Sequence, residues 1–363
     1  MSKRRLSAAA AGVLILGAIS FYGLQKWCEL NNPSLGNVLG LMPSDANAAV
    51  FVNLRELRQA PFFAEVVAWA PQLGIDADYK QFLRETNFDY EKDLDRFAIA
   101  TKTHAAESEH FAVAEGRFDR NKIEAYASKL GRMEKRSGKQ IFSVPIGSYS
   151  RRISFVFLSN DRIALTDAQD LSAFPGQNPR NSDTAEWQTR FLRLAGTPIF
   201  AVIRQDASTS VSRTAPSTSR SLAERATAGM RFPEVSALVK QLQWITVAGK
   251  PENDRLRMVA EGECNAGSIV QQLTDLLNGV ILVAQAGLNS AKMREQLDTR
   301  TREAYLELLR SMDVSQVDRG ETKSVRLVFH VTPKLLEVAR NAESVKSPTS
   351  PNSSPPGKIP TRK

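Results

Sequence analysis

Two glutamates in a repeated stretch are the residues of this 363-residue chain whose type and spacing best fit chemistry. The tetrapeptide Val-Ala-Glu-Gly occurs around Glu115 and again around Glu261. Equivalent carboxylates of a repeated unit can meet near an internal two-fold axis, where they could do acid–base work or bind a cation. A glutamate in a strand is otherwise solvated or paired with arginine, and Arg117 and Arg257 are near in the sequence. Glu115 and Glu261 are therefore the candidate catalytic pair, with ion pairing as the structural alternative.

The histidines offer little metal chemistry. His104 and His110 flank the acidic turn 107–109, and His330 lies far downstream in the last expected strand. Histidines spread in this way lack the close spacing of metal ligands. We expect a solvated turn at 107–109, no metal site and no cofactor.

Motifs of common enzyme classes are missing from the sequence. The stretch from Gly131 to Lys139 ends in Gly-Lys as a phosphate-binding loop does, but its glycine spacing is wrong and Gln140 replaces the required hydroxyl. The sequence contains neither a Gly-x-Ser-x-Gly elbow nor a His-Glu-x-x-His motif nor a dinucleotide-binding glycine pattern. These observations favour a protein that is not an enzyme.

The repeat extends beyond the glutamates and organises the chain. An isoleucine follows ten residues after the first valine of each tetrapeptide (Ile123 and Ile269), and the strand-like segment 199–204 parallels 50–55. Ordered matches at a nearly constant offset indicate a duplication. We predict an α+β fold of two tandem related βαββαβ-like units, with antiparallel sheets and helices on one face, after an N-terminal transmembrane helix.

Alternation, helical periodicity and capping residues predict the elements of both units. Strands are expected at 48–54, 96–101, 110–118, 140–144, 153–159, 162–166, 199–204, 244–249, 255–263, 314–318 and 323–331. Helices are expected at 61–70, 77–85, 120–130, 183–195, 233–242, 268–288, 291–312 and 333–341. The apolar helix 268–288 is expected to be buried in a hairpin with 291–312, and the alternative is a partner-binding face.

The N-terminus is typical of a membrane anchor. Three basic residues precede an uncharged run of 19 residues, 6–24, which as a helix just crosses a hydrocarbon core of about 30 Å. The excess of positive charge before this run places the N-terminus inside and the bulk of the chain outside the cytoplasm. A cleavable signal peptide with a site at Ala18-Ile19-Ser20 is the alternative.

Six regions follow from these patterns. They are a basic cytoplasmic stretch (1–5), a transmembrane signal anchor (6–24), a spacer (25–41), a first unit with a connecting helix (42–196), and a second unit (197–341) that contains a flexible loop (206–220) and a helical hairpin (268–312), then a disordered tail (342–363).

Charge and cysteine content narrow the functional classes. Of the net charge of +9, three positive charges lie in the first five residues and a net three in the tail, which leaves +3 for the folded part. That is no basic footprint, so nucleic acid is disfavoured as a partner. Cys28 and Cys264 are expected to be unpaired thiols, with a single disulfide between them, or between chains at Cys28, as the alternatives.

The segment from Leu41 to Asp45, followed by the strand 49–54 and a helix that begins near Pro61-Phe62, resembles the start of uncharacterised bacterial exported proteins. The resemblance implies an N-terminal membrane anchor and duplicated α+β domains of unknown function. It is carried by the anchor and the start of the first unit, and it brings no catalytic residues.

The sequence favours a membrane-anchored, extracytoplasmic binding or scaffolding protein of the bacterial cell envelope. It would sit in the inner (cytoplasmic) membrane by a single pass, with its bulk in the periplasm, and would bind the membrane through its N-terminal helix and a protein partner in the envelope. The alternative function is an envelope hydrolase that uses Glu115 and Glu261 in a cleft between the two units. A third class, an accessory subunit of a transport or secretion system, would have membrane partners.

Overall fold

The structure is a computed structural model that describes residues 41–43, 45–64, 77–104, 107–136, 138–145, 152–171, 186–193, 197–204 and 237–344. The expected membrane anchor 6–24 and loop 206–220 lie outside these residues, as do most of the expected helix 61–70 and the tail beyond 344.

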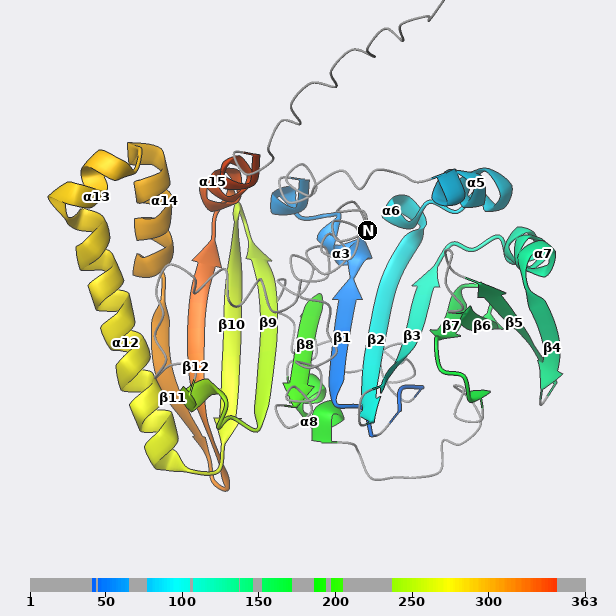
Figure 1. Ribbon diagram of the computed structural model, residues 1–363, viewed down its shortest axis with the longest axis horizontal. Coiled ribbons are helices and arrows are strands. Elements are labelled where there is room, and N and C mark those ends of the chain that lie inside the picture. The colour runs from blue at the N-terminus through cyan, green and yellow to red at the C-terminus, as the bar shows by residue number, and fades with distance from the viewer. Residues whose placement is uncertain are drawn as a thin grey trace, which may run out of the picture.

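The chain has a mixed α and β fold built on one antiparallel sheet of twelve strands (Figure 1). The strand order is β11-β12-β10-β9-β8-β1-β2-β3-β7-β6-β5-β4. The strands are β1 (Ala48–Asn53), β2 (Leu94–His104), β3 (Glu107–Gly116), β4 (Arg132–Arg136), β5 (Lys139–Pro145), β6 (Arg152–Ser159), β7 (Arg162–Thr166), β8 (Ile199–Arg204), β9 (Trp244–Glu252), β10 (Arg255–Cys264), β11 (Asp313–Arg319) and β12 (Thr322–Val331). The sequence pattern missed β4, because its residues, Arg-Met-Glu-Lys-Arg, are almost all exposed and do not alternate.

The two halves of the chain meet at the centre of the sheet, where β1 pairs with β8 in antiparallel register. Phe51 lies directly opposite Phe200. On one side of this pair the order runs β1-β2-β3-β7, and on the other it runs β8-β9-β10-β12, so each half places its third strand beside the last strand of that half. The two expected units therefore share a single continuous sheet instead of forming separate ones.

Helices cover both faces of the sheet, so the expectation that they lie on one face is wrong. On one face, Trp187 and Phe191 of α8 (Glu186–Arg193) pack against Phe51 and Phe200 in a buried cluster. On the other face, hydrophobic clusters join the sheet to α7 (Arg120–Leu130), α12 (Gly267–Asn289) and α15 (Pro333–Ser344). Side chains of successive residues in a strand alternate between faces, and both faces of the central strands are apolar, which is why both can bury a helix.

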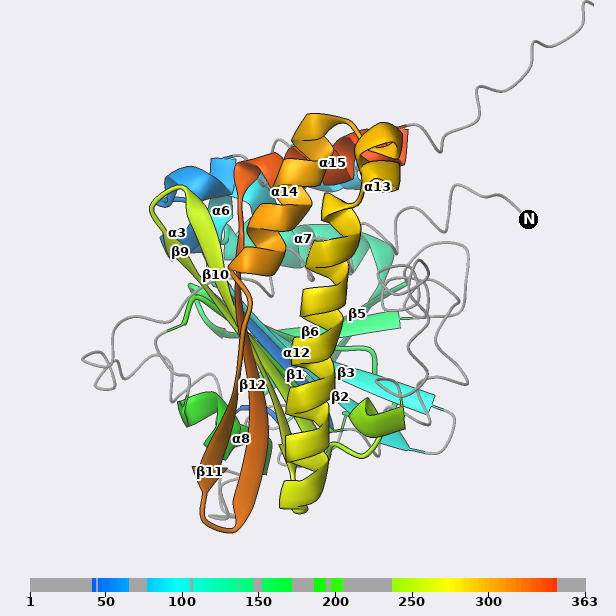
Figure 2. The same ribbon diagram turned by 90° about the vertical axis from the view of Figure 1, so that its left-hand side faces the viewer.

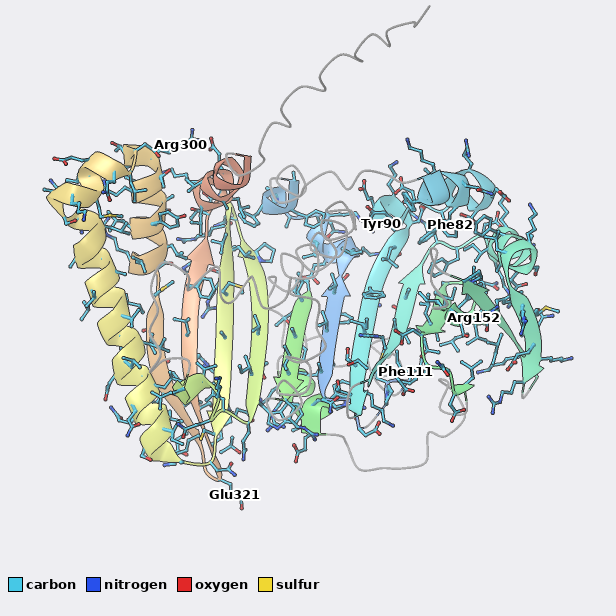
Figure 3. The ribbon with its side chains drawn as sticks, in the orientation of Figure 1. Phe82, Tyr90, Phe111, Arg152, Arg300 and Glu321 are labelled. Atoms are coloured by element: carbon cyan, nitrogen blue, oxygen red, sulfur yellow. The ribbon has the colours of Figure 1, made fainter. Side chains whose placement is uncertain are left out.

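Short helices close the ends of the sheet. They are α3 (Leu54–Leu57), α5 (Ala77–Thr86) and α6 (Tyr90–Asp93). Phe82 and Tyr90 mark α5 and α6 at one end of the molecule (Figure 3), where the Tyr79 ring stacks on Phe82 and packs at a tilt against Tyr90.

The expected single helix 291–312 is two helices, α13 (Ala291–Gln296) and α14 (Thr299–Arg310). The break comes at Leu297 and Asp298, where the Asp298 side chain accepts a hydrogen bond from the Thr301 N–H at 2.9 Å. An aspartate that satisfies a free N–H at a helix start favours a new helix over continuation. The signal is local, because Asp298 directly precedes the helical run that begins at Thr299.

The repeated Val-Ala-Glu-Gly stretches end in glycines that other segments approach closely. A Cβ at Gly116 would lie 2.3 Å from the Asp93 carbonyl oxygen, and one at Gly262 would lie 2.5 Å from a terminal methyl of Leu242. Neighbouring Ala114 belongs to the same buried cluster as Ile123 and Ala127 of α7. Small residues in both stretches thus let other segments approach the sheet closely.

Candidate functional site

Glu115 lies on β3 as part of a buried ion-pair cluster. Its carboxylate, in a residue only 9% exposed, accepts from Arg162 Nε at 2.9 Å and from Arg96 Nη1 at 3.2 Å. Arg162 lies directly opposite Glu115 on β7, and Arg96 lies opposite it on β2. Both oxygens of the carboxylate are therefore held by guanidinium groups on the two neighbouring strands.

Glu261 repeats this arrangement on β10. Glu261 is 3% exposed. Arg326 lies directly opposite Glu261 on β12, and its Nη2 donates a hydrogen bond to the Glu261 carboxylate at 3.2 Å. Arg319 also donates to it, as does the Ser324 hydroxyl at 3.0 Å. Burial by itself raises the pKa of Glu261, but the hydrogen bond and charge of Arg319 and the charge of Arg326 outweigh it and hold the pKa below its ordinary value.

A third buried glutamate, Glu263, was missed by sequence reasoning. It is 1% exposed and accepts from Arg190 Nε at 2.7 Å and from Arg193, both on α8. The Arg190 guanidinium in turn lies 4.3 Å from the centre of the Trp244 ring. Nothing local in the sequence marks Glu263, because its partners lie about 70 residues upstream and reach it only through the fold.

The candidate pair Glu115 and Glu261 is not brought together. Four strands, β2, β1, β8 and β9, separate β3 from β10. Five inter-strand steps of about 4.8 Å put the two strands roughly 24 Å apart. Carboxylates that act on one glycosidic bond stand about 5–10 Å apart. Each glutamate therefore works in its own cluster.

The arginines expected to neutralise the two glutamates pair elsewhere. Arg117 donates to Asp93 at 3.0 Å, and Arg257 lies 3.7 Å from Glu252. Sequence proximity suggested the wrong partners. Neighbours along one strand alternate between the two faces of the sheet or lie several residues away, whereas residues directly opposite each other on adjacent strands lie side by side on the same face. The ion-pair alternative was right for both glutamates, with different arginines.

The histidines form separate pairs. His110 Nδ1 lies 2.8 Å from Asp167 Oδ2, and His330 Nε2 lies 3.7 Å from Glu252. Burial raises the pKa of Asp167, but hydrogen bonds from His110 outweigh it and lower the pKa overall. Among the described residues, no three His, Cys, Asp or Glu side chains gather as metal ligands would.

The stretch that ends in Gly-Lys is a hairpin. Lys139 begins β5 after a turn at Gly138, whose φ is 79°.

Cys264 is a buried free thiol on β10, 4% exposed. Its Sγ accepts from the Ala266 N–H at 3.4 Å. Cys28 lies outside the described residues.

The apolar helix α12 is exposed along one side, so the expectation of a buried helix is wrong. Leu282 and Val283 are 66% and 64% exposed. The buried residues of this 23-residue helix are Val270, Leu273, Thr274 and Ala284. Figure 2 shows α12 running the full length of the sheet beside β11 and β12. Among the described helices it alone is long and apolar enough to cross a membrane, and 22% of its apolar window is buried.

Glycines add to the exposed side of α12. A Cβ at Gly279 or Gly287 would meet nothing within 4 Å. With Val283 these residues are spaced four apart and share one side of the helix. We call Gly279, Leu282, Val283, Ala286 and Gly287 the α12 surface. Monomeric proteins seldom leave large neighbouring apolar side chains this exposed without a binding role.

The fold and these residues define a mixed α and β protein with one large antiparallel sheet, buried Glu–Arg clusters and an exposed apolar helix. No protein-family model matches the chain, and no curated protein matches it. The chain is similar to solved structures of TP0453. For crystal form III the TM-score is 0.40 at 11% identity, covering 84% of this chain and 97% of that chain. For crystal form I the TM-score is 0.37 at 11% identity, covering 84% and 96%.

Proposed function

We propose that this chain is a membrane-anchored binding or scaffolding protein of the bacterial cell envelope, and not an enzyme. The single observation that carries the binding role is the α12 surface, with Leu282 66% and Val283 64% exposed. Contact between exposed apolar side chains and water is unfavourable. Burying these side chains against a partner therefore drives association. We propose that the partner is another protein of the envelope.

The position of the glutamates supports a binding role over a hydrolase. Glu115 and Glu261 lie on strands that four others separate, and two arginines hold each carboxylate. The guanidinium groups occupy the oxygens of each carboxylate, so neither carboxylate is free to accept a proton from a substrate. The hydrolase alternative has no pair of nearby carboxylates at these positions.

The sequence pattern supports the location. We propose that 6–24 spans the inner membrane once, with the bulk of the chain in the periplasm, because three basic residues precede this uncharged run of 19 residues. Protease accessibility in spheroplasts tests it: we expect protease added outside the cells to digest the chain. Full protection in intact spheroplasts, with digestion after lysis, would contradict the location without affecting the α12 surface.

We further propose that two tandem related units arose by duplication. The sequence match aligns Phe51 with Phe200, and these two residues lie opposite each other across β1 and β8. A two-fold axis through that pair would exchange the halves. The cross-strand pairs Glu115–Arg162 and Glu261–Arg326 join the third and the last strand of each half.

A photo-crosslinking amino acid at Val283 tests the binding role. In cells that express the full chain, we expect ultraviolet light to yield a discrete protein adduct from position 283. Met133, an apolar residue 57% exposed on the edge strand β4 at the far end of the sheet, is the matched control. Adducts of equal yield from Met133, or none from 283 beyond lipid and the chain itself, would overturn the protein-partner proposal.

A further inference from the structure

The buried carboxylates of β10 are surrounded by more positive charge than they neutralise. Four guanidinium groups from three elements, those of Arg190, Arg193, Arg319 and Arg326, contact the two carboxylates of Glu261 and Glu263. We call these four residues the arginine cluster. Glu186 approaches Arg190 at 3.9 Å, but its side chain is 73% exposed and is largely screened by water. The cluster therefore has an excess of positive charge beside a buried strand.

Three members of the cluster keep donors that the glutamates do not use. Arg193 contacts Glu263 through Nη2, Arg319 contacts Glu261 and Ser324 through Nη1, and Arg326 uses Nε and Nη2. Each guanidinium has five N–H donors in all. The side chains of Arg193, Arg319 and Arg326 are 29%, 26% and 36% exposed, so the remaining donors can be reached from solvent.

The residues share one face of the sheet. Glu261 lies opposite Arg326 on β12, so both point to the same side, as does Glu263 two residues further along β10. On the other face, Val325 of β12 packs with α12, so α12 does not cover the cluster. Figure 3 shows Glu321 at the tip of the β11–β12 hairpin, just beyond Arg319, which marks the end of the sheet where the cluster lies.

A buried hydroxyl beside the cluster lacks a partner. Thr246 on β9 lies directly opposite Glu261 and is 1% exposed. Its Oγ1 makes no hydrogen bond in the part of the chain that the structure describes. Buried polar groups in native proteins are nearly always bonded, and an orphan one points to an ion or ligand group that completes it.

We propose that the arginine cluster binds a phosphate-bearing anion on the sheet face between α8 and the β11–β12 hairpin. Guanidinium groups recognise phosphate by paired N–H donation, and arginine keeps its charge at any physiological pH. Glu261 and Glu263 then position the arginines, and the excess positive charge attracts the ligand. The phosphate is that of a free anion or of a lipid or polymer headgroup. This site lies on the opposite face from the α12 surface, so the inference does not depend on the proposed function.

Calorimetric titration of the full chain with pyrophosphate, in uncharged detergent at low salt, tests the proposal. We expect saturable binding with one site per chain, weakened about tenfold or more by Arg193→Gln and by Arg319→Gln, since each removes charge-assisted hydrogen bonds. Arg257→Gln is the matched control, because Arg257 lies on the same strand and face, four residues before Glu261. It should change affinity less than about twofold.

Vesicles separate the sources of the phosphate. Binding to phosphatidylglycerol vesicles but not to phosphatidylcholine vesicles, lost in Arg319→Gln, would assign a lipid headgroup, whereas pyrophosphate binding without vesicle binding would assign a soluble anion or polymer. If Arg319→Gln does not fold, Arg319→Lys keeps the charge, loses the forked donors and should still weaken binding. Absence of pyrophosphate binding by the unaltered chain, or equal weakening by Arg257→Gln, would overturn the proposal.

Discussion

The replacement Glu261→Gln tests whether the glutamates of the repeated stretches are structural ion pairs. It removes the charge that neutralises Arg319 and Arg326 and keeps the shape of the side chain. Breaking a buried ion pair costs about 3–5 kcal/mol when the remaining charge is fully buried. Because the two arginines keep 26% and 36% exposure, water takes over part of their solvation. We therefore expect the free energy of unfolding to fall by about 2 kcal/mol at pH 7.

The effect should depend on pH in a defined direction. The pKa of Glu261 is lower in the folded chain than its ordinary value. A lowered pKa contributes stability that is present above the unfolded pKa, about 4.3, and is lost as pH falls through the folded pKa. The difference between the natural chain and Glu261→Gln should therefore be largest at neutral pH and shrink towards pH 3.

Urea unfolding of the full chain in uncharged detergent, followed by circular dichroism at pH 7 and pH 3, measures both effects. Arg257→Gln serves as the control, since Arg257 is 38% exposed and lies 3.7 Å from Glu252, where exposed pairs contribute about 0.5 kcal/mol or less. A loss below about 0.5 kcal/mol for Glu261→Gln, or a loss that persists unchanged at pH 3, would refute the ion-pair role.

Three further predictions rest on other parts of the fold. Gly116→Ala should lower the free energy of unfolding by at least about 2 kcal/mol, because the new Cβ would lie 2.3 Å from the Asp93 carbonyl oxygen. Gly279→Ala, whose new Cβ would have nothing within 4 Å, should raise the free energy of unfolding by about 0.5–1 kcal/mol. Equal effects of the two replacements in denaturant titrations would contradict this prediction. Asp119→Ala removes the cap that accepts from the Lys122 N–H, and should cost about 1 kcal/mol in the same assay; an unchanged midpoint would exclude that cap. In a Cys28→Ser background, Cys264, 4% exposed, should react with a thiol reagent only after unfolding, and rapid labelling of the folded chain would show that β10 opens.

The elements with local signals could be read from the sequence. The helix 120–130 was predicted at the bounds of α7, because Asp119 caps its start and Gly131 ends it. The strands 162–166 and 199–204 were likewise predicted at the bounds of β7 and β8. Such signals act over a few residues and need no tertiary context.

The prediction of a buried helix at 268–288 was wrong because burial depends on which surfaces of the fold meet. The helix 268–288 is apolar enough for a core, and only its position beside β11 and β12 shows that Leu282 and Val283 remain exposed. Composition alone cannot distinguish a buried helix from a helix whose apolar side is exposed.

The sequence by itself determined that Glu115 and Glu261 occupy the same position in a tetrapeptide that occurs twice, because residue identity can be read directly from the chain. Only the tertiary structure decided their chemistry. Pairing of β1 with β8 places the two glutamates in opposite halves of a twelve-stranded sheet, and the strands beside each supply its arginines. The physical reason is that charge interactions depend on distance in space, and in a sheet the nearest neighbours of a residue lie across the strands and not along the chain.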